Sequence, residues 1–150
     1  MNKPRISFIT FGTSNLKRAK HFYEAWLGLT ASSSSTEHIL FYQLGDIVLG
    51  IWSREKLAED AGRPYPPSSG KEVEPPFDGV AFARNLPSKE AVDREISRAV
   101  AAGGTCSKPA ADTFWGGYSG YILDPDGHAW ELAWNPHWPL DAEGRITLPK

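Results

Sequence analysis

A proline-rich stretch at residues 62–77 divides the sequence into two halves that carry the same order of predicted elements. This stretch contains five prolines and two glycines, which interrupt regular structure, and we interpret it as a linker. Each half reads as a strand, a helix and then three strands, although the two halves share very little residue identity. A repeated order of elements at this period predicts two similar modules.

The first module covers about residues 4–61 and begins with β-branched and aromatic residues at 5–11, which predict a strand. Apolar residues recur at helical spacing over 15–27, and Gly28 can end the helix in the left-handed conformation. The Gly45-Asp46 turn is typical of a hairpin. The remaining strands of this module are predicted at 29–33, 38–44 and 47–53, followed by one or two helical turns at 54–61.

The second module covers about residues 78–135 and repeats the pattern. Pro87 and Ser88 can open a helix over 88–102, and Gly103-Gly104 can end it. The strands of this module are predicted at 79–83, 105–108, 117–123 and 128–134. In the tail, residues 136–150, apolar side chains surround a Glu143-Gly144 turn, so we expect it to fold back as a short hairpin.

Charge and composition exclude several classes of partner. The 16 basic and 18 acidic residues give a net charge of −2 and are interspersed, which argues against nucleic-acid binding. No apolar run approaches the roughly 20 residues of a membrane helix, and the N-terminus lacks the apolar segment of a signal peptide. Cys106 is the only cysteine, so no intrachain disulfide can form. We therefore expect a cytoplasmic protein.

Two segments resemble the opening and closing motifs of the glyoxalase, bleomycin-resistance and extradiol dioxygenase proteins, the vicinal-oxygen-chelate superfamily. The matching positions are Phe8, Asn15-Leu16, Phe22-Tyr23 and Leu27-Gly28, then Trp115 to Tyr121, Asp124-Pro125-Asp126-Gly127 and Glu131. The resemblance covers residues 4–136. It implies a single domain over residues 1–150 with an α+β fold, in which two βαβββ modules form a curved mixed sheet around a central cleft.

Enzymes of this superfamily hold a divalent metal through four side chains, two on the first strands of the modules and two on the last. By alignment to the motifs, the four positions fall on Phe8, Gly50, Gly79 and Glu131. Phenylalanine and glycine side chains offer no donor atom, and zinc sites use three or four protein ligands. No two of the four histidines have the spacing of a ligand pair on one element. We therefore expect no metal and no other cofactor.

Strand alternation predicts which side chains line the implied cleft. The expected ligand-binding residues are Phe8, Thr10, Trp52 and Glu131, bordered by Trp115, Tyr118 and Tyr121. Trp130, Leu132 and Trp134 should face the other way, beneath the helix. Apolar walls with few polar groups are typical of a small-molecule pocket. Glu131 can bind a cation or act as a catalytic general base there; the alternative is a structural carboxylate held by Thr10, a tyrosine hydroxyl or water.

Three functions remain open from the sequence. The first is a metal-independent protein that binds a small organic ligand in an apolar, aromatic cleft. The second is a metal-dependent lyase or dioxygenase of glyoxalase type, in which Glu131 and residues outside the alignment hold the ion. The third is a structural or regulatory dimer with a vestigial cleft. We expect a homodimer in each case, because many superfamily members pair and aromatic residues, which are numerous here, are enriched in interfaces.

Overall fold

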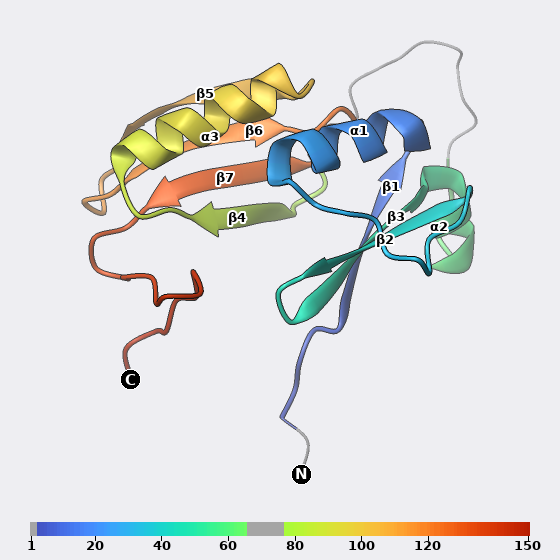
Figure 1. Ribbon diagram of the computed structural model, residues 1–150, viewed down its shortest axis with the longest axis horizontal. Helices are drawn as coiled ribbons and strands as arrows, with labels where there is room; N and C mark the ends of the chain where they lie inside the picture. The colour runs from blue at the N-terminus through green and yellow to red at the C-terminus, as the bar shows by residue number, and fades with distance from the viewer. Residues whose placement is uncertain (1–2, 66–76) are drawn as a thin grey trace. The chain divides into compact units, whose positions relative to one another are not determined.

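The computed structural model describes residues 3–65 and 77–150, and the chain divides into two compact units, Met1–Pro75 and Pro76–Lys150. Each unit combines a mixed β-sheet with helices (Figure 1), which confirms the predicted α+β class. The central part of the linker lies outside the described residues. None of the described helices is long and apolar enough to cross a membrane.

The first unit contains a three-stranded sheet with the order β1-β3-β2. Its elements are β1 (Phe8–Thr13), α1 (Leu16–Leu27), β2 (Ile39–Leu44), β3 (Ile47–Ser53) and α2 (Arg54–Asp60). β1 is parallel to β3, and β2 is antiparallel to it. The predicted helix is confirmed: the Asn15 side chain accepts a hydrogen bond from the Arg18 amide, and Gly28 ends the helix at φ 67°. The predicted hairpin at Gly45-Asp46 is also present.

The strand predicted at residues 29–33 is wrong, because this segment forms no regular ladder. Serine hydroxyl groups within this segment and just after it bond to the backbone instead. The Ser35 hydroxyl accepts a hydrogen bond from the Phe41 amide at 2.9 Å, and Ser32 Oγ accepts one from the Ser34 amide at 3.1 Å. Such side-chain bonds replace strand pairing. One backbone bond, from the Ser32 amide to the Phe41 carbonyl, keeps the segment beside β2.

The second unit contains a four-stranded sheet with the order β4-β7-β6-β5. Its elements are β4 (Ala81–Asn85), α3 (Lys89–Ala101), β5 (Thr105–Asp112), β6 (Tyr118–Leu123) and β7 (Ala129–Trp134). α3 lies across β5, β6 and β7 (Figure 1). The predicted helix is confirmed, and Ser88 caps its start. Its first strand begins two residues later than expected, because Gly79 has a φ of 86° that a strand does not accommodate.

The tail prediction is only partly right. The Asp141 amide donates to the Arg145 carbonyl at 2.9 Å, so the chain does turn at Glu143-Gly144. No strand forms on either side of this turn, however, and Ile146 and Leu148 are exposed. The segments flanking the turn therefore lack the cross-strand pairs that stabilise a hairpin.

Each sheet has one buried face, and strand alternation predicts it correctly. In the first unit this face carries Leu40, Tyr42, Leu49, Ile51 and Phe11, and α1 packs on it through Ala19, Phe22, Tyr23 and Trp26. In the second unit Trp130 and Leu132 are buried on the side of α3, as expected. The opposite face of each sheet is not covered by α1 or α3.

One ionic group lies in the interface between α3 and its sheet. Glu95 is 6% exposed and accepts hydrogen bonds from Arg84 at 2.7 Å and from Arg98 at 2.6 Å. Burial alone would raise the pKa of the Glu95 carboxyl, but the two guanidinium groups outweigh it and hold this pKa below its ordinary value. The folded state therefore favours the ionised form of Glu95.

Glu95→Gln should lower the free energy of unfolding by about 1–3 kcal/mol at neutral pH, because two guanidinium groups lose a charged acceptor. Because its pKa is lowered on folding, the Glu95 contribution is complete above the pKa of the unfolded chain and disappears as the pH falls through the folded value. Urea unfolding at a series of pH values measures both effects. The matched control is Glu59→Gln, whose carboxylate is 73% exposed beside Lys56 and should contribute less than about 0.5 kcal/mol. Equal losses in the two variants would contradict this account.

Candidate functional site

In the first unit, the sheet face opposite α1 brings together three of the expected ligand-binding residues. Phe8 and Thr10 lie on β1, where their register partners on β3 are Val48 and Gly50. Gly50 also pairs with Phe41 on β2. Trp52 lies two residues beyond Gly50 and so shares this face. Phe8, Thr10 and Trp52 therefore lie on one face of this sheet.

Gly50 forms the floor of this face, and an aromatic ring covers it. A Cβ atom on Gly50 would lie 3.3 Å from Phe8 Cε1 and 3.2 Å from Thr10 Oγ1, so the Phe8 ring leans over the glycine. Phe41 lies on β2, on the other side of Gly50 from β1. Its ring packs edge-to-face with the Phe8 ring, with 5.6 Å between the ring centroids. This is a favourable aromatic geometry. Phe8 nevertheless remains 49% exposed, so it can contact a ligand as well.

A cavity of about 310 Å³ opens beside this aromatic pair, within the first unit. Its apolar walls are Phe8, Phe41 and Val48, and Ser32, Ser34 and Gln43 give it polar groups. Tyr42 also lines it, although the Tyr42 side chain is buried on the side of α1. Sequence reasoning missed Phe41 and the serines. Phe41 could have been found by counting back from the Gly45-Asp46 hairpin, which places it opposite Gly50. No sequence pattern predicted that Ser32 and Ser34 line the cavity, because their segment is held by side-chain hydrogen bonds and not by strand pairing.

In the second unit, Glu131 lies on the sheet face opposite α3, at the centre of a group of small side chains. Its register partners are Ala83 on β4 and Tyr121 on β6. Ala129 and Ala133 flank it along β7. Burial raises the pKa of the Tyr121 hydroxyl, and the neighbouring Glu131 charge and the hydrogen bond that Tyr121 donates to it raise that pKa further. The sequence suggested Thr10, a tyrosine hydroxyl or water as the partner of Glu131, and the structure shows the Tyr121 hydroxyl in that role.

Tyr118 does not belong to this group, which corrects the sequence prediction. Tyr118 and Tyr121 are three positions apart on β6, so their side chains point to opposite faces. The Tyr118 hydroxyl donates to Asp93 of α3 at 2.7 Å, and Lys89 Nζ lies 5.5 Å from the centre of its ring. Tyr118 therefore packs with the helix.

Trp115 lies in the loop between β5 and β6 and is half-buried. A Cβ on Gly117 would overlap the Trp115 ring and would lie 2.5 Å from the Trp134 carbonyl oxygen. The indole thus rests on the glycine backbone. Its neighbour Phe114 is fully exposed at the tip of the same loop. No contact in the described residues links Trp115 with Glu131, and its role in ligand binding stays a prediction.

The residues at the four chelate positions do not fit a divalent metal. Phe8 and Gly50 offer no donor, and Gly79 lies before β4 rather than on it. Glu131 has an alanine and a tyrosine as its cross-strand neighbours. Among the described residues there is no group of three or more His, Cys, Asp or Glu side chains arranged to hold a metal ion. A single carboxylate is too few ligands for a structural or catalytic centre.

Comparison with known proteins now decides the family. The model of the Glyoxalase/Bleomycin resistance protein/Dioxygenase superfamily matches residues 5–132. The chain belongs to this superfamily. A glyoxalase-related enzyme from Fulvimarina pelagi is 34% identical over 97% of this chain and 99% of its own, with a TM-score of 0.83. The superfamily resemblance inferred from the two motifs is thereby confirmed.

More distant structures of the superfamily share the fold alone. Lactoylglutathione lyase from Agrobacterium tumefaciens is 20% identical over 92% of this chain and 98% of its own, with a TM-score of 0.63. The fosfomycin resistance protein FosX from Mesorhizobium loti is 18% identical over 90% of this chain and 94% of its own, with a TM-score of 0.59. A search of curated proteins gave no significant match. Superfamily proteins with different activities thus share this fold, so the function has to be argued from the side chains.

Glu131→Gln should lower the pKa of Tyr121, because the substitution removes the carboxylate that disfavours a tyrosinate beside it. The value should stay above that of free tyrosine, since burial remains. An alkaline titration followed by NMR of ring-labelled tyrosine measures the shift, and Tyr121→Phe assigns the signal. The control is Tyr118, whose pKa is raised mainly by its bond to Asp93 and should not move. An unchanged Tyr121 titration would show that the two side chains are not in contact.

Proposed function

We propose that this member of the glyoxalase superfamily binds a small organic molecule, in the cytoplasm, without the help of a metal ion. The observation that supports the proposal best is the Phe8 ring over Gly50. In a metal enzyme of the superfamily these positions supply side-chain donors. Here an aromatic side chain takes that space and forms one wall of a cavity of about 310 Å³. That volume lies at the lower end of the usual range for small-molecule sites.

Glu131 is the candidate polar ligand contact of the second unit, considered on its own. Tyr121 donates a single hydrogen bond to it, and a carboxylate can accept several more. The alanines beside Glu131 on β4 and β7 have short side chains that offer no competing polar group. A ligand amine or hydroxyl is the matching chemistry, because it can donate to the remaining lone pairs. The same carboxylate could take a proton as a general base, but nothing in this arrangement requires a reaction.

Metal content separates this proposal from a metal-dependent lyase or dioxygenase. We expect purified protein to contain nickel, zinc, iron and manganese well below one ion per chain, because residues 3–65 and 77–150 hold no group of three or more His, Cys, Asp or Glu side chains that could bind an ion together with Glu131. Elemental analysis before and after dialysis against each ion tests this. Stoichiometric metal that is lost in Glu131→Gln, but kept in the exposed control Glu143→Gln, would establish the metal-dependent alternative instead.

Ligand binding is tested with a small aromatic amine, phenethylamine, and its uncharged analogue ethylbenzene. Binding of the amine should raise the unfolding temperature, since ligand at 100 times its dissociation constant stabilises a protein by about 2.7 kcal/mol. Glu131→Gln tests the second unit and should remove any stronger binding of the amine compared with ethylbenzene. Phe8→Ala tests the cavity of the first unit and should weaken the binding of ethylbenzene, because Phe8 forms one of its walls. Glu143→Gln should change neither. If the compounds raise the unfolding temperature equally in all variants, or if no amine in a wider screen raises it, a vestigial cleft would be favoured instead.

A homodimer is the expected assembly. Several large apolar side chains of the described residues are exposed, including Ile6 at 67%, Phe77 at 74% and Phe114 at 102%. Two of these side chains are aromatic, and aromatic residues are enriched in protein interfaces. Light scattering at micromolar concentration should therefore give twice the chain mass of 16.5 kDa. A mass of one chain over that range would contradict the prediction.

A further inference from the structure

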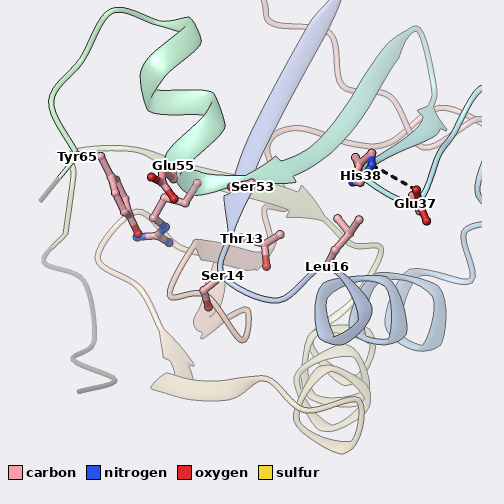
Figure 2. Close-up of a pocket in the computed structure, with 9 residues that line it drawn as sticks. Thr13, Ser14, Leu16, Glu37, His38, Ser53, Glu55 and Tyr65 are labelled. Atoms are coloured by element: carbon pink, nitrogen blue, oxygen red, sulfur yellow. Dashed lines mark ion pairs between the residues drawn. The ribbon is translucent and has the colours of Figure 1, made fainter. Parts of the chain in front are cut away.

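The first unit contains two cavities of different chemical character. The larger, of about 430 Å³, is a polar cavity at the carboxyl ends of β1 and β3 (Figure 2). Glu37, Arg54 and Glu55 bring charges of both signs to its lining. The smaller, of about 310 Å³, is the cavity beside Phe8, and the described residues that line it carry no charge at neutral pH. An ion in the smaller cavity would lose water without gaining an opposite charge, so this cavity favours an uncharged ligand.

One row of paired residues crosses the sheet beneath the cavity beside Phe8. Val48 on β3 has Phe8 on β1 as its register partner on one side and Gln43 on β2 on the other. Adjacent strands are about 4.8 Å apart, so the backbones of Phe8 and Gln43 are separated by roughly 10 Å. The Phe8 ring leans over Gly50, and the half-buried Val48 lines the cavity between the two. A ligand ring on Val48 would therefore contact Phe8 on one side and have Gln43 within reach on the other.

Gln43 offers this cavity a hydrogen-bond acceptor. Its Nε2 atom donates to the Gly45 carbonyl at 2.6 Å and to the Ile47 carbonyl at 3.2 Å, so both of its N–H groups are used. These two carbonyls also fix the orientation of the side-chain amide, because only its NH₂ end can donate to them. Oε1 is then the end of the amide that is left to accept a hydrogen bond from a ligand.

The serines of the cavity lie at a different place along β2. The Ser32 amide donates to the Phe41 carbonyl at 2.8 Å, and Ser32 Oγ accepts from the Ser34 amide at 3.1 Å. Both serines are therefore beside Phe41, and Gln43 is two residues, or about 7 Å, further along the strand. A single ligand hydroxyl group is accordingly assigned to Gln43 alone.

We propose that the cavity beside Phe8 binds an uncharged aromatic alcohol. This assignment rests on the proposed function and names the ligand class of its first-unit cavity. The aromatic ring of the ligand lies on Val48 beside the Phe8 ring, and a hydroxyl group on a short carbon chain donates to Gln43 Oε1. An apolar cavity of about 150 Å³ is enough for benzene, so about 310 Å³ accommodates one ring with such a chain.

Isothermal titration of the full chain with four related probes tests the proposal. 2-Phenylethanol has the ring and the hydroxyl donor, its methyl ether keeps the oxygen but lacks the donor, ethylbenzene has the ring alone, and phenylacetate is an anion. We expect phenylacetate to bind at least about tenfold more weakly than 2-phenylethanol, because its charge finds no partner in the cavity. In NMR spectra of the wild-type complex, the ring protons of 2-phenylethanol should show contacts to the Val48 methyl groups, and its CH₂–OH protons should show contacts to the Gln43 side chain.

Gln43→Met tests the hydroxyl contact, because methionine has a similar length and lacks the amide oxygen. It should weaken 2-phenylethanol about fivefold, the usual net effect of one neutral hydrogen bond, and should change the methyl ether and ethylbenzene by less than about twofold. Ser33→Ala is the matched control, since Ser33 is exposed between the two serines of the cavity and lines neither cavity. Glu37→Gln, in the polar cavity, should also leave all four affinities unchanged.

The outcomes separate this inference from the proposed function. If ethylbenzene and 2-phenylethanol bind the wild type but Gln43→Met weakens the alcohol no more than the ether, the aromatic alcohol assignment is overturned and the cavity of the proposed function remains. The same holds if the NMR contacts of the bound alcohol do not include Val48 and Gln43, a measurement that needs no variant. If none of the uncharged probes binds at millimolar concentration, the inference and the proposed binding in this cavity both fail.

Discussion

Parallel pairing of the first and last strands is the constraint on which each unit depends. β1 pairs with β3 in the first unit, and β4 pairs with β7 in the second. A parallel pair cannot be closed by a tight turn and needs a long crossover, which here includes the helix α1 or α3. The crossover helix covers one face of its sheet and leaves the opposite face available for ligands. In the first unit the same pairing brings the carboxyl ends of two strands together, where the polar cavity forms.

Sequence patterns predicted those parts of the structure that depend on periodicity and turn chemistry. The helices follow from apolar spacing between Asn15 and Gly28 and after Ser88. Alternation on β7 correctly placed Trp130 and Leu132 beneath α3, with Glu131 on the other face. These features are local, so a single strand or helix contains the information needed to predict them.

Two kinds of feature could not be predicted from the sequence. One depends on side-chain hydrogen bonds that compete with strand pairing, and the other depends on pairing between distant segments. Residues 29–33 have strand composition, but the serines after them satisfy the backbone with hydroxyl groups. Tyr118 was grouped with Tyr121 by motif, although an odd spacing on one strand separates their faces. The partnership of Phe8 and Phe41 requires the order β1-β3-β2, which no single strand reveals.

Glu131 shows how the same position can serve different chemistry on one fold. A carboxylate on a strand becomes a metal ligand only when neighbouring strands provide further donors at the same level. Ala83 and Tyr121 stand at that level here, so the carboxylate is paired with a tyrosine hydroxyl that donates a hydrogen bond to it. The pKa of Tyr121 is raised, which keeps that donor in place through neutral and moderately alkaline pH. The pair is thus suited to hold a neutral or positively charged donor group of a ligand, and it provides no Lewis acid of its own.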